Sequence, residues 1–367
     1  MNMAELLQSL QGPGRKTPRP LESEPVLIYG AGNKGKQVAA FLVDRGHEVI
    51  GLADAAANGA ETWLGLPIRR LEDWRTKGTD RSATIVVAIH NCHVDMAPLL
   101  AWLAQGATAR IVNPVEFQAI FSRQFPDSYW LAGPEAYDGQ DDNLTDLEEL
   151  LADDTSRDLL RRVVEFRLTG NYAALPAPTP TEQYCPADLP RWLQPLRFVD
   201  AGAFTGDTLR QFKRCGHEFE QIVAFEPDPE NFGHLSRCVA DLGGGICLPC
   251  GLSDTTRQLR FAAEGTGASR IADDGQQFVQ CVALDEALPG FRPTLIKMDI
   301  EGAEPDALQG AARTIAACRP ALAISVYHRP AHLWTIALLI DQWRLGYRFY
   351  LRMHGHSSFD LVLYALP

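Results

Sequence analysis

Short apolar runs that end in polar residues recur along the second half of the chain, at residues 198–201, 222–226, 246–252 and 294–299. Runs of this length without strict alternation are typical of strands buried on both faces of a parallel sheet. In open sheets of this kind, ligands bind at the carboxyl ends of the strands. The pattern therefore predicts an α/β fold whose polar strand ends share one edge.

Glycine residues follow the first of these strands, in the segment DAGAFTGDT at residues 200–208. Gly202 and Gly206 would let backbone N–H groups approach a ligand closely, as they do in nucleotide-binding turns. Glu226 ends the next strand about 20 residues later, where doubly wound folds place an acid that hydrogen-bonds ribose hydroxyls. The two glycines are four residues apart, so their spacing differs from that of the dinucleotide fingerprint. From the glycines and the acid together, we expect the turn to hold a nucleotide-like cofactor.

The first part of the chain carries a second strand–turn–helix pattern. Residues 26–29 form an apolar run, a G-x-G-x-x-G turn and an Ala- and Val-rich helix follow, and a second apolar run ends in an acid. This order predicts a smaller Rossmann-like domain at residues 25–120, with a nucleotide site at Gly30, Gly32, Gly35 and Asp54. A domain that kept the fold and lost its ligand stays open as an alternative, because fold alone does not carry function.

Two further segments flank this domain. Residues 1–24 are expected to be disordered, and residues 121–182 are expected to form a helical and Pro-rich connector. The two halves should therefore fold separately, with the second domain at residues 183–367. Small residues at 265–270 predict a hairpin or a loop over the cofactor.

Five segments of the second domain, DAGAFTGDT, AFEPDP, GLSD, LIKMDIEGAE and SVYHRP, resemble the FkbM-type methyltransferases in order and spacing. The resemblance implies a Rossmann-like methyltransferase sheet, S-adenosylmethionine (SAM) as cofactor, and transfer of a methyl group to a hydroxyl of a small molecule, a sugar or a glycan. The first domain resembles nucleotide-sugar-binding domains. By the same resemblance, the cofactor-binding residues are Asp200, Gly202, Ala203, Phe204, Gly206, Asp207, Thr208, Glu226, Pro227, Ser253 and Asp299.

A hydroxyl group is a poor nucleophile until it loses its proton, so a base near the acceptor would help. His328 follows the apolar run 321–326 and has an ordinary pKa of about 6.5, so we predict that it accepts the proton and gives the pH–rate profile an acid limb. Asp299 and Glu301 are the other catalytic candidates, and the resemblance places both at the reacting centre. No set of metal ligands is evident, so we expect no metal.

Composition and net charge limit the classes of binding partner that we expect. The chain has 367 residues, 46% of them hydrophobic, and a net charge of −12, which argues against binding to nucleic acid or to an anionic membrane. It lacks a membrane-length apolar run and a signal peptide, so we expect a soluble cytoplasmic protein whose partner is a hydroxyl-bearing small molecule or sugar. A homo-oligomer stays open.

A rival function uses the other half of the chain. In that alternative, the G-x-G-x-x-G unit is a nucleotide- or NAD-binding module or an oxidoreductase, and the second domain is a degenerate methyltransferase scaffold. The complete series of Asp200, Glu226 and Asp299 favours the methyltransferase.

Overall fold

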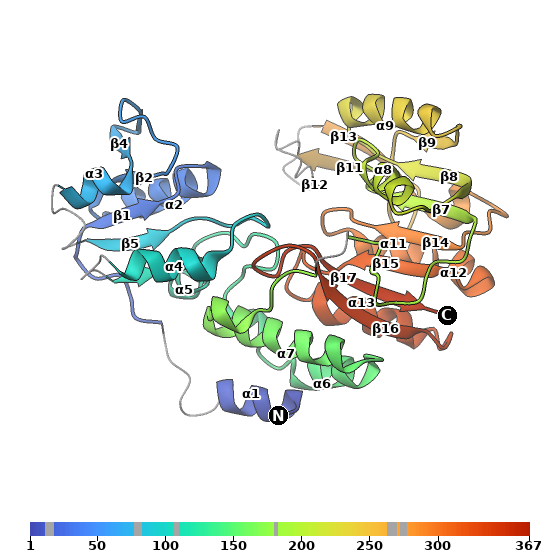
Figure 1. Ribbon diagram of the computed structural model, residues 1–367, viewed down its shortest axis with the longest axis horizontal. Coiled ribbons are helices and arrows are strands. Elements are labelled where there is room, and N and C mark those ends of the chain that lie inside the picture. Colours follow the sequence, from blue (N-terminus) through green and yellow to red (C-terminus); the bar gives the residue numbers. More distant parts are fainter. Residues whose placement is uncertain (12–17, 77–82, 106–109, 180–182, 263–269, 272–276) are drawn as a thin grey trace. The chain divides into compact units, whose positions relative to one another are not determined.

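The computed structural model describes residues 1–11, 18–76, 83–105, 110–179, 183–262, 270–271 and 277–367 (Figure 1). The chain divides into two compact units. The N-terminal unit comprises Met1–Asp141, Leu160–Ala177 and Gly355–Phe359, and the C-terminal unit comprises Asp142–Leu159, Pro178–His354 and Asp360–Pro367. The loop expected at 265–270 lies outside the described residues except for its last position.

The N-terminal unit is built on a sheet with the strand order β3-β4-β2-β1-β5-β6. The central strand β1 pairs in parallel with both β2 and β5, which confirms the strand–helix–strand order expected from the sequence. Its strands are β1 (Val26–Tyr29), β2 (Val49–Ala53), β3 (Thr62–Trp63), β4 (Leu66–Arg69), β5 (Thr84–Val87) and β6 (Ile111–Val112). Its helices include α2 (Asn33–Asp44), α3 (Leu71–Thr76), α4 (Met96–Ala104), α5 (Pro114–Ile120) and the short η2 (Pro134–Tyr137) and η3 (Tyr172–Ala174).

The C-terminal unit contains a larger sheet with the order β16-β17-β15-β14-β7-β8-β9 (Figure 1). The strands from β15 to β9 run parallel, and β17 is antiparallel to its two neighbours, so the expected α/β class is confirmed. The strands are β7 (Leu196–Ala201), β8 (Phe219–Phe225), β9 (Ile246–Leu248), β14 (Leu295–Met298), β15 (Ala321–Ser325), β16 (Arg348–Met353) and β17 (Leu361–Leu366).

Helices and a smaller sheet complete this unit. The helices are α8 (Asp207–Arg214), α9 (Pro229–Asp241), α10 (Leu284–Ala287), α11 (Glu304–Gly310), α12 (Ala312–Cys318) and α13 (His332–Gln342). A four-stranded sheet joins β10 (Gly251–Leu252), β13 (Gln277–Val282), β11 (Arg257–Ala262) and β12 (Arg270–Ile271).

Register places the polar strand ends side by side. Asp200 of β7 is paired with Lys297 of β14 and with Ala224 of β8, and Ala201 is paired with Met298 and Phe225. The residues that follow these strands therefore leave the sheet at the same edge. The core beneath that edge is apolar, and its members include Phe198, Phe212, Leu235 and Tyr364.

The connector expected at residues 121–182 is shared between the two units rather than lying between them. The C-terminal unit contains α6 (Asp141–Leu150) from Asp142 onward and the start of α7 (Asp154–Thr169). Arg352 of β16, buried to 3% exposure, lies 2.7 Å from Asp153 and donates to the Ser156 hydroxyl at 2.9 Å. The Ser156 hydroxyl also accepts the N–H of Leu351. The expected boundaries are therefore corrected, since this stretch is part of the fold.

The first residues also depart from expectation. Residues 1–24 were expected to be disordered, but Met3–Gln11 form helix α1, in which Met3, Leu6 and Leu7 are buried. Apolar residues at this helical spacing cover one face, and burying that face is what stabilises a helix of this length.

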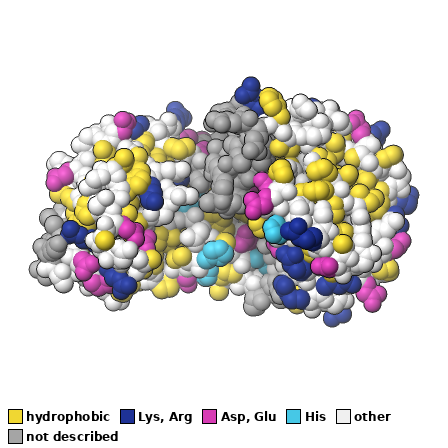
Figure 2. Space-filling view, turned by 90° about the horizontal axis from the view of Figure 1, so that it is seen from above, with side chains coloured by type: hydrophobic (Ala, Val, Ile, Leu, Met, Phe, Trp, Pro, Cys, Tyr) yellow, Lys and Arg dark blue, Asp and Glu magenta, His cyan; other side chains and the backbone are white. Residues whose placement is uncertain are grey.

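Charged side chains of both signs are spread over the face of the molecule that Figure 2 shows, among hydrophobic and uncharged ones. No helix of the described residues is long and apolar enough to cross a membrane.

A chain that begins at Pro180 tests the role of the connector. It would lack Asp153 and Ser156, leaving buried Arg352 with Asp188 as its remaining acidic partner. Removing one partner of a buried ion pair costs about 3–5 kcal/mol, so this fragment should unfold at much lower denaturant than one that begins at Gln140. Equal denaturation midpoints for the two fragments would show that the connector is dispensable, as the sequence suggested.

Candidate functional site

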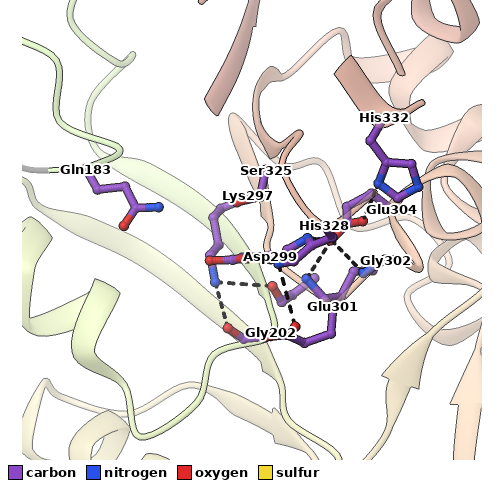
Figure 3. Close-up of polar contacts among 12 residues, drawn as sticks. Gln183, Gly202, Lys297, Asp299, Glu301, Gly302, Glu304, Ser325, His328 and His332 are labelled. Carbon is purple, nitrogen blue, oxygen red and sulfur yellow. Dashed lines mark hydrogen bonds and ion pairs between the residues drawn. The ribbon is translucent and has the colours of Figure 1, made fainter. Parts of the chain in front are cut away.

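The turn after β7 rests on a buried ion pair. Asp200 is fully buried, and its Oδ1 lies 3.1 Å from Lys297 Nζ. The same ammonium group donates to the carbonyl oxygens of Gly202 at 2.6 Å and Ala201 at 3.3 Å (Figure 3). Burial raises the pKa of Asp200 to about 6, against the opposing effect of Lys297. Asp200 therefore supports the turn from beneath, and any effect of this carboxylate on a ligand is transmitted through the turn.

The surrounding chain leaves no room for a side chain at either glycine of the turn. Gly202 has φ +72, and a Cβ atom there would lie 1.9 Å from the carbonyl oxygen of Asp299. Gly206 has φ +84, and its Cβ would lie 2.7 Å from Cys238 Sγ. The sequence suggested that Gly202 is needed so that backbone N–H groups can approach a ligand closely. The structure gives a different reason, which is the close approach of the turn to the backbone that follows β14.

Glu226 fixes the other side of the turn. Its Oε2 accepts the N–H of Phe204 at 2.8 Å, and its Oε1 accepts the N–H of Asp228 at 2.9 Å. Burial raises the pKa of this carboxyl, and the two backbone N–H groups oppose that shift. Phe204 itself has φ +46 and is 42% exposed. The acid therefore holds an exposed aromatic ring in a strained backbone conformation at the carboxyl edge of the sheet.

A second set of polar side chains follows β14 and β15 at the same edge of the sheet. Asp299 accepts a hydrogen bond from the Tyr184 hydroxyl on Oδ2 at 2.8 Å, and its Oδ1 lies 3.2 Å from His328 Nε2 (Figure 3). Glu301 Oε2 lies 3.8 Å from the same nitrogen. The side chains of Asp299 and Glu301 are 24% and 27% exposed, whereas that of His328 is 1% exposed. Two partly accessible carboxylates therefore meet at one buried imidazole.

Glu304, the first residue of α11, holds the far side of that imidazole. Its Oε1 lies 2.8 Å from His328 Nδ1, and its Oε2 lies 3.2 Å from His332 Nδ1. The carboxylate also accepts the N–H groups of Ile300 at 2.9 Å and Gly302 at 3.4 Å, and it is fully buried. Glu304 thus fixes both the ring of His328 and the loop that carries Glu301.

Both sides of His328 are acidic, and this sets its protonation. Burial alone would lower the pKa of the imidazole, but Glu304 and Asp299 outweigh burial and raise it well above its usual range. Burial would raise the pKa of Asp299, yet His328, Lys297 and Tyr184 lower it to about 2. This arrangement favours the protonated form of His328. The raised pKa runs against the expectation of an ordinary imidazole, and the acid limb of the pH–rate profile stays a prediction.

Comparison with known proteins agrees with this geometry. Residues 200–349 match the family model of the methyltransferase FkbM domain. This range includes the glycine turn, Glu226 and the polar cluster of Asp299, Glu301, Glu304, His328 and His332, which is called the His328 cluster below. This stretch, residues 200–349, is called the FkbM domain below, after the family model that it matches. The crystal structure of the methyltransferase FkbM from Methylobacillus flagellatus KT has the same fold, with a TM-score of 0.79 and 23% identity over 99% of this chain and 98% of that one.

Other matches add little. An rRNA methylase from Streptococcus thermophilus aligns over 46% of this chain and 84% of its own, with 13% identity and a TM-score of 0.28. No curated protein matches the chain.

Most of the remaining cofactor candidates of the FkbM domain follow β7 and β8 at the same edge of the seven-stranded sheet. Ala203 is buried within the turn, Asp207 and Thr208 open helix α8, and Pro227 follows Glu226. Ser253 follows β10, is 1% exposed, and donates its hydroxyl to Asp254 at 2.9 Å. The candidates after β7 and β8 therefore share one edge, whereas Ser253 follows a strand of the smaller sheet. Their role in cofactor binding stays a prediction.

Four residues of the C-terminal unit escaped the sequence analysis. Lys297, Glu304 and His332 act through buried contacts, and Tyr184 reaches Asp299 from 115 residues earlier in the chain. Glu304 could have been noticed, because it lies in the same LIKMDIEGAE segment as Asp299 and Glu301. Lys297 lies in that segment too, two residues before Asp299, whereas nothing in the sequence marked Tyr184 and His332 as neighbours of the site.

In the N-terminal unit, as in the FkbM domain, a carboxylate accepts a backbone N–H of the glycine turn. Asp54 Oδ2 accepts the N–H of Ala31 at 2.8 Å, as Glu226 does for Phe204. A Cβ at Gly35 would lie 1.9 Å from the Gly30 carbonyl oxygen, and Gly30 has φ +106. Gly32 has open space around its Cβ position. Gly30 and Gly35 are thus explained by the fold, and a nucleotide site at this turn stays a prediction.

Replacing Gly202 by Ala tests the contact between the turn and Asp299. We expect Gly202→Ala to lower the free energy of unfolding by more than about 2 kcal/mol, because both the positive φ and the clash act against a side chain. Gly216→Ala is the matched control, since Gly216 has φ +79 and nothing within 4 Å of its Cβ position. Equal losses in the two variants, measured by denaturant unfolding, would show that the close approach carries no energetic weight.

His90 of the N-terminal unit gives a pH dependence that can be measured. It contacts the Ser128 carbonyl oxygen at 3.2 Å and packs on Phe359, and burial, with a smaller effect of Lys34, lowers its pKa to about 3. Below pH about 6.5 the unfolded chain binds a proton that the folded chain does not, so stability should fall by about 1–2 kcal/mol between pH 7 and pH 5. His90→Gln should flatten that decline in denaturant unfolding. An unchanged slope would assign the pH dependence to other groups.

Proposed function

We propose that this chain is a SAM-dependent O-methyltransferase that methylates a hydroxyl group of a small molecule, a sugar or a glycan. One observation carries the proposal. The glycine turn suited to a nucleoside lies against the backbone of Asp299, with a hypothetical Gly202 Cβ only 1.9 Å from the Asp299 carbonyl oxygen. A cofactor on that turn and an acceptor at the Asp299–His328 cluster would therefore be neighbours, as methyl transfer requires.

The groups along the turn suit a nucleoside that carries a positive charge. Carboxylate oxygens accept more than one hydrogen bond, so Glu226 can receive ribose hydroxyls while it holds the Phe204 and Asp228 N–H groups. The exposed ring of Phe204 offers an apolar face for the base. Asp299, kept ionised by its low pKa, offers negative charge for a sulfonium. When bound, SAM supplies an electrophilic methyl group.

At the acceptor, the main task of the protein is to align the reacting atoms rather than to form bonds to them. Methyl transfer is an in-line displacement, and holding the acceptor oxygen behind the methyl carbon removes several kcal/mol of barrier. Asp299 and Glu301 are the partly exposed acceptors for a substrate hydroxyl, and His328 and Tyr184 fix the direction of Asp299. His328 can take up the hydroxyl proton only after its own Nε2 proton has gone, because it is protonated in the arrangement described here.

The rival proposal, a nucleotide- or NAD-binding module with a degenerate methyltransferase scaffold, rests on Gly30, Gly32, Gly35 and Asp54. The intact turn of the FkbM domain, with Asp200, Glu226 and Asp299 each held by specific contacts, favours methyl transfer. Calorimetric titration of the full chain with SAM and with NADH separates the two proposals. Heat with NADH and none with SAM would support the rival.

Glu226→Gln tests the cofactor assignment. Losing a charge-assisted hydrogen bond to ribose should weaken SAM binding by about 1–3 kcal/mol, which is roughly a 5- to 150-fold rise in Kd. Glu220→Gln is the matched control, because Glu220 lies on the same strand, is 49% exposed and pairs with Arg197 away from the turn. Unchanged SAM affinity in Glu226→Gln, with an unchanged unfolding midpoint, would contradict the role of this acid. Incubation with SAM labelled at the methyl group and candidate alcohols then identifies the product.

A further inference from the structure

We propose that the His328 cluster is a binding site for one divalent first-row metal ion. The ligands are His328 Nε2, Asp299 Oδ1 and Glu301 Oε2. The sequence suggested no metal, because these residues belong to two segments almost 30 positions apart. In the fold they converge after β14 and β15, where an oxygen of Asp299 and an oxygen of Glu301 both lie near Nε2 of His328. A group that could hold a metal ion lies at the same point: one ligand atom from each of Asp299, Glu304 and His328 is within 4.8 Å of the others. Glu304 faces the opposite nitrogen of the ring, so we assign it to orienting His328.

The distances suit ligands of a common ion. Two atoms that each lie about 2.1 Å from one metal, at right angles, are about 3 Å apart. Nε2 of His328 lies 3.2 Å from Asp299 Oδ1 and 3.8 Å from Glu301 Oε2. Small rotations of these side chains would close the remaining gap, and their partial exposure leaves room for water or a substrate oxygen as further ligands.

The far nitrogen of His328 and the second oxygen of Asp299 are each held by another group. Glu304 occupies Nδ1 of His328, which makes Nε2 the nitrogen that can bind metal and fixes the direction of the ring. Tyr184 donates to Oδ2 of Asp299, which leaves Oδ1 directed to the cluster. Glu304 is in turn held by His332 and by the N–H groups of Ile300 and Gly302. Metal-binding histidines are commonly oriented by a carboxylate in this way.

Charge also favours a cation. Asp299 and Glu301 both face Nε2 of His328, and buried Glu304 faces Nδ1, so three carboxylates surround one imidazole ring. The ammonium group of Lys297 is paired with Asp200 and directed to the carbonyls of the turn. A divalent ion in place of the Nε2 proton supplies two positive charges where that proton supplies one.

The ligand types narrow the ion. Two carboxylates suit Mg²⁺ and Mn²⁺, whereas an imidazole suits Zn²⁺ and other later first-row ions. Mn²⁺ accepts both ligand types and tolerates several waters, so it is the ion that we expect and the probe that we would use.

The chemical consequence rests on the proposed O-methyl transfer. A metal ion lowers the pKa of an oxygen bound to it, and it holds that oxygen in place. An acceptor hydroxyl bound at the open positions would lose its proton to water, and its oxygen would then attack the methyl carbon as the C–S bond breaks. His328 would act as a ligand, which agrees with its lack of a free nitrogen for base chemistry.

Metal binding can be tested without SAM or an acceptor, so the result does not depend on the proposed function. The full chain, dialysed against a chelator, is titrated with Mn²⁺ by calorimetry and by electron paramagnetic resonance of free Mn²⁺. We expect one Mn²⁺ per chain. Asp299→Asn and His328→Gln should abolish saturable binding, and Glu304→Gln should weaken it about 10- to 100-fold. Asp306→Asn, which removes a 58% exposed acid from the same helix as Glu304, should bind Mn²⁺ as the parent does.

Two results overturn the proposal. One is the absence of saturable binding of Mn²⁺, Zn²⁺ and Mg²⁺ at millimolar concentration by folded parent protein. The other is Mn²⁺ binding that persists in both Asp299→Asn and His328→Gln, with circular dichroism showing that these variants are folded. If Mn²⁺ binds as expected but chelation leaves methyl transfer unchanged, the ion is structural and its role in activating the acceptor is overturned.

Discussion

The close approach of the glycine turn to the start of the loop after β14 governs the rest of the site. Gly202 lies so near the Asp299 carbonyl oxygen that no side chain fits between them, and Lys297 ties Asp200 to the carbonyls of Ala201 and Gly202. The glycine turn, where we propose that the cofactor binds, and the loop that carries Asp299 are therefore one rigid assembly. Such an assembly supplies the alignment on which methyl transfer depends, since small displacements of a reacting atom are costly.

Both units use a carboxylate at the end of the second strand to hold the first turn. Glu226 accepts the N–H of Phe204, and Asp54 accepts the N–H of Ala31. Such an acid stabilises the empty turn and remains able to accept hydroxyl groups of a ligand. The acid is therefore explained by its structural role in stabilising the turn. Its presence alone does not distinguish a ligand-binding site from a fold that has lost its ligand. The difference in this chain lies beyond the turn, in the polar cluster that only the C-terminal unit has at its sheet edge among the residues described.

Local patterns predicted the strands, the glycine turns and the acids at their ends, because these depend on neighbours within a few residues. Contacts that join distant segments could not be read in this way. The ion pair of Asp200 with Lys297 spans 97 positions, and that of Arg352 with Asp153 spans 199. Residues 121–182 looked like a linker because they are rich in charge and proline, yet Asp153 and Ser156 serve a buried arginine. The same limit applies to His328, whose strand end was foreseen but whose acidic partner Glu304 was not.

The protonation of His328 follows from where its partners stand. A histidine that serves as a base needs one nitrogen held by a partner and the other directed at the substrate. Here Glu304 takes Nδ1, as a partner should, but Asp299 and Glu301 take the side on which a substrate proton would arrive. A proton at Nε2 is therefore a bridge between the ring and these carboxylates. The geometry suits a positive charge at that point better than it suits a proton acceptor, whether the charge is a proton or a metal ion.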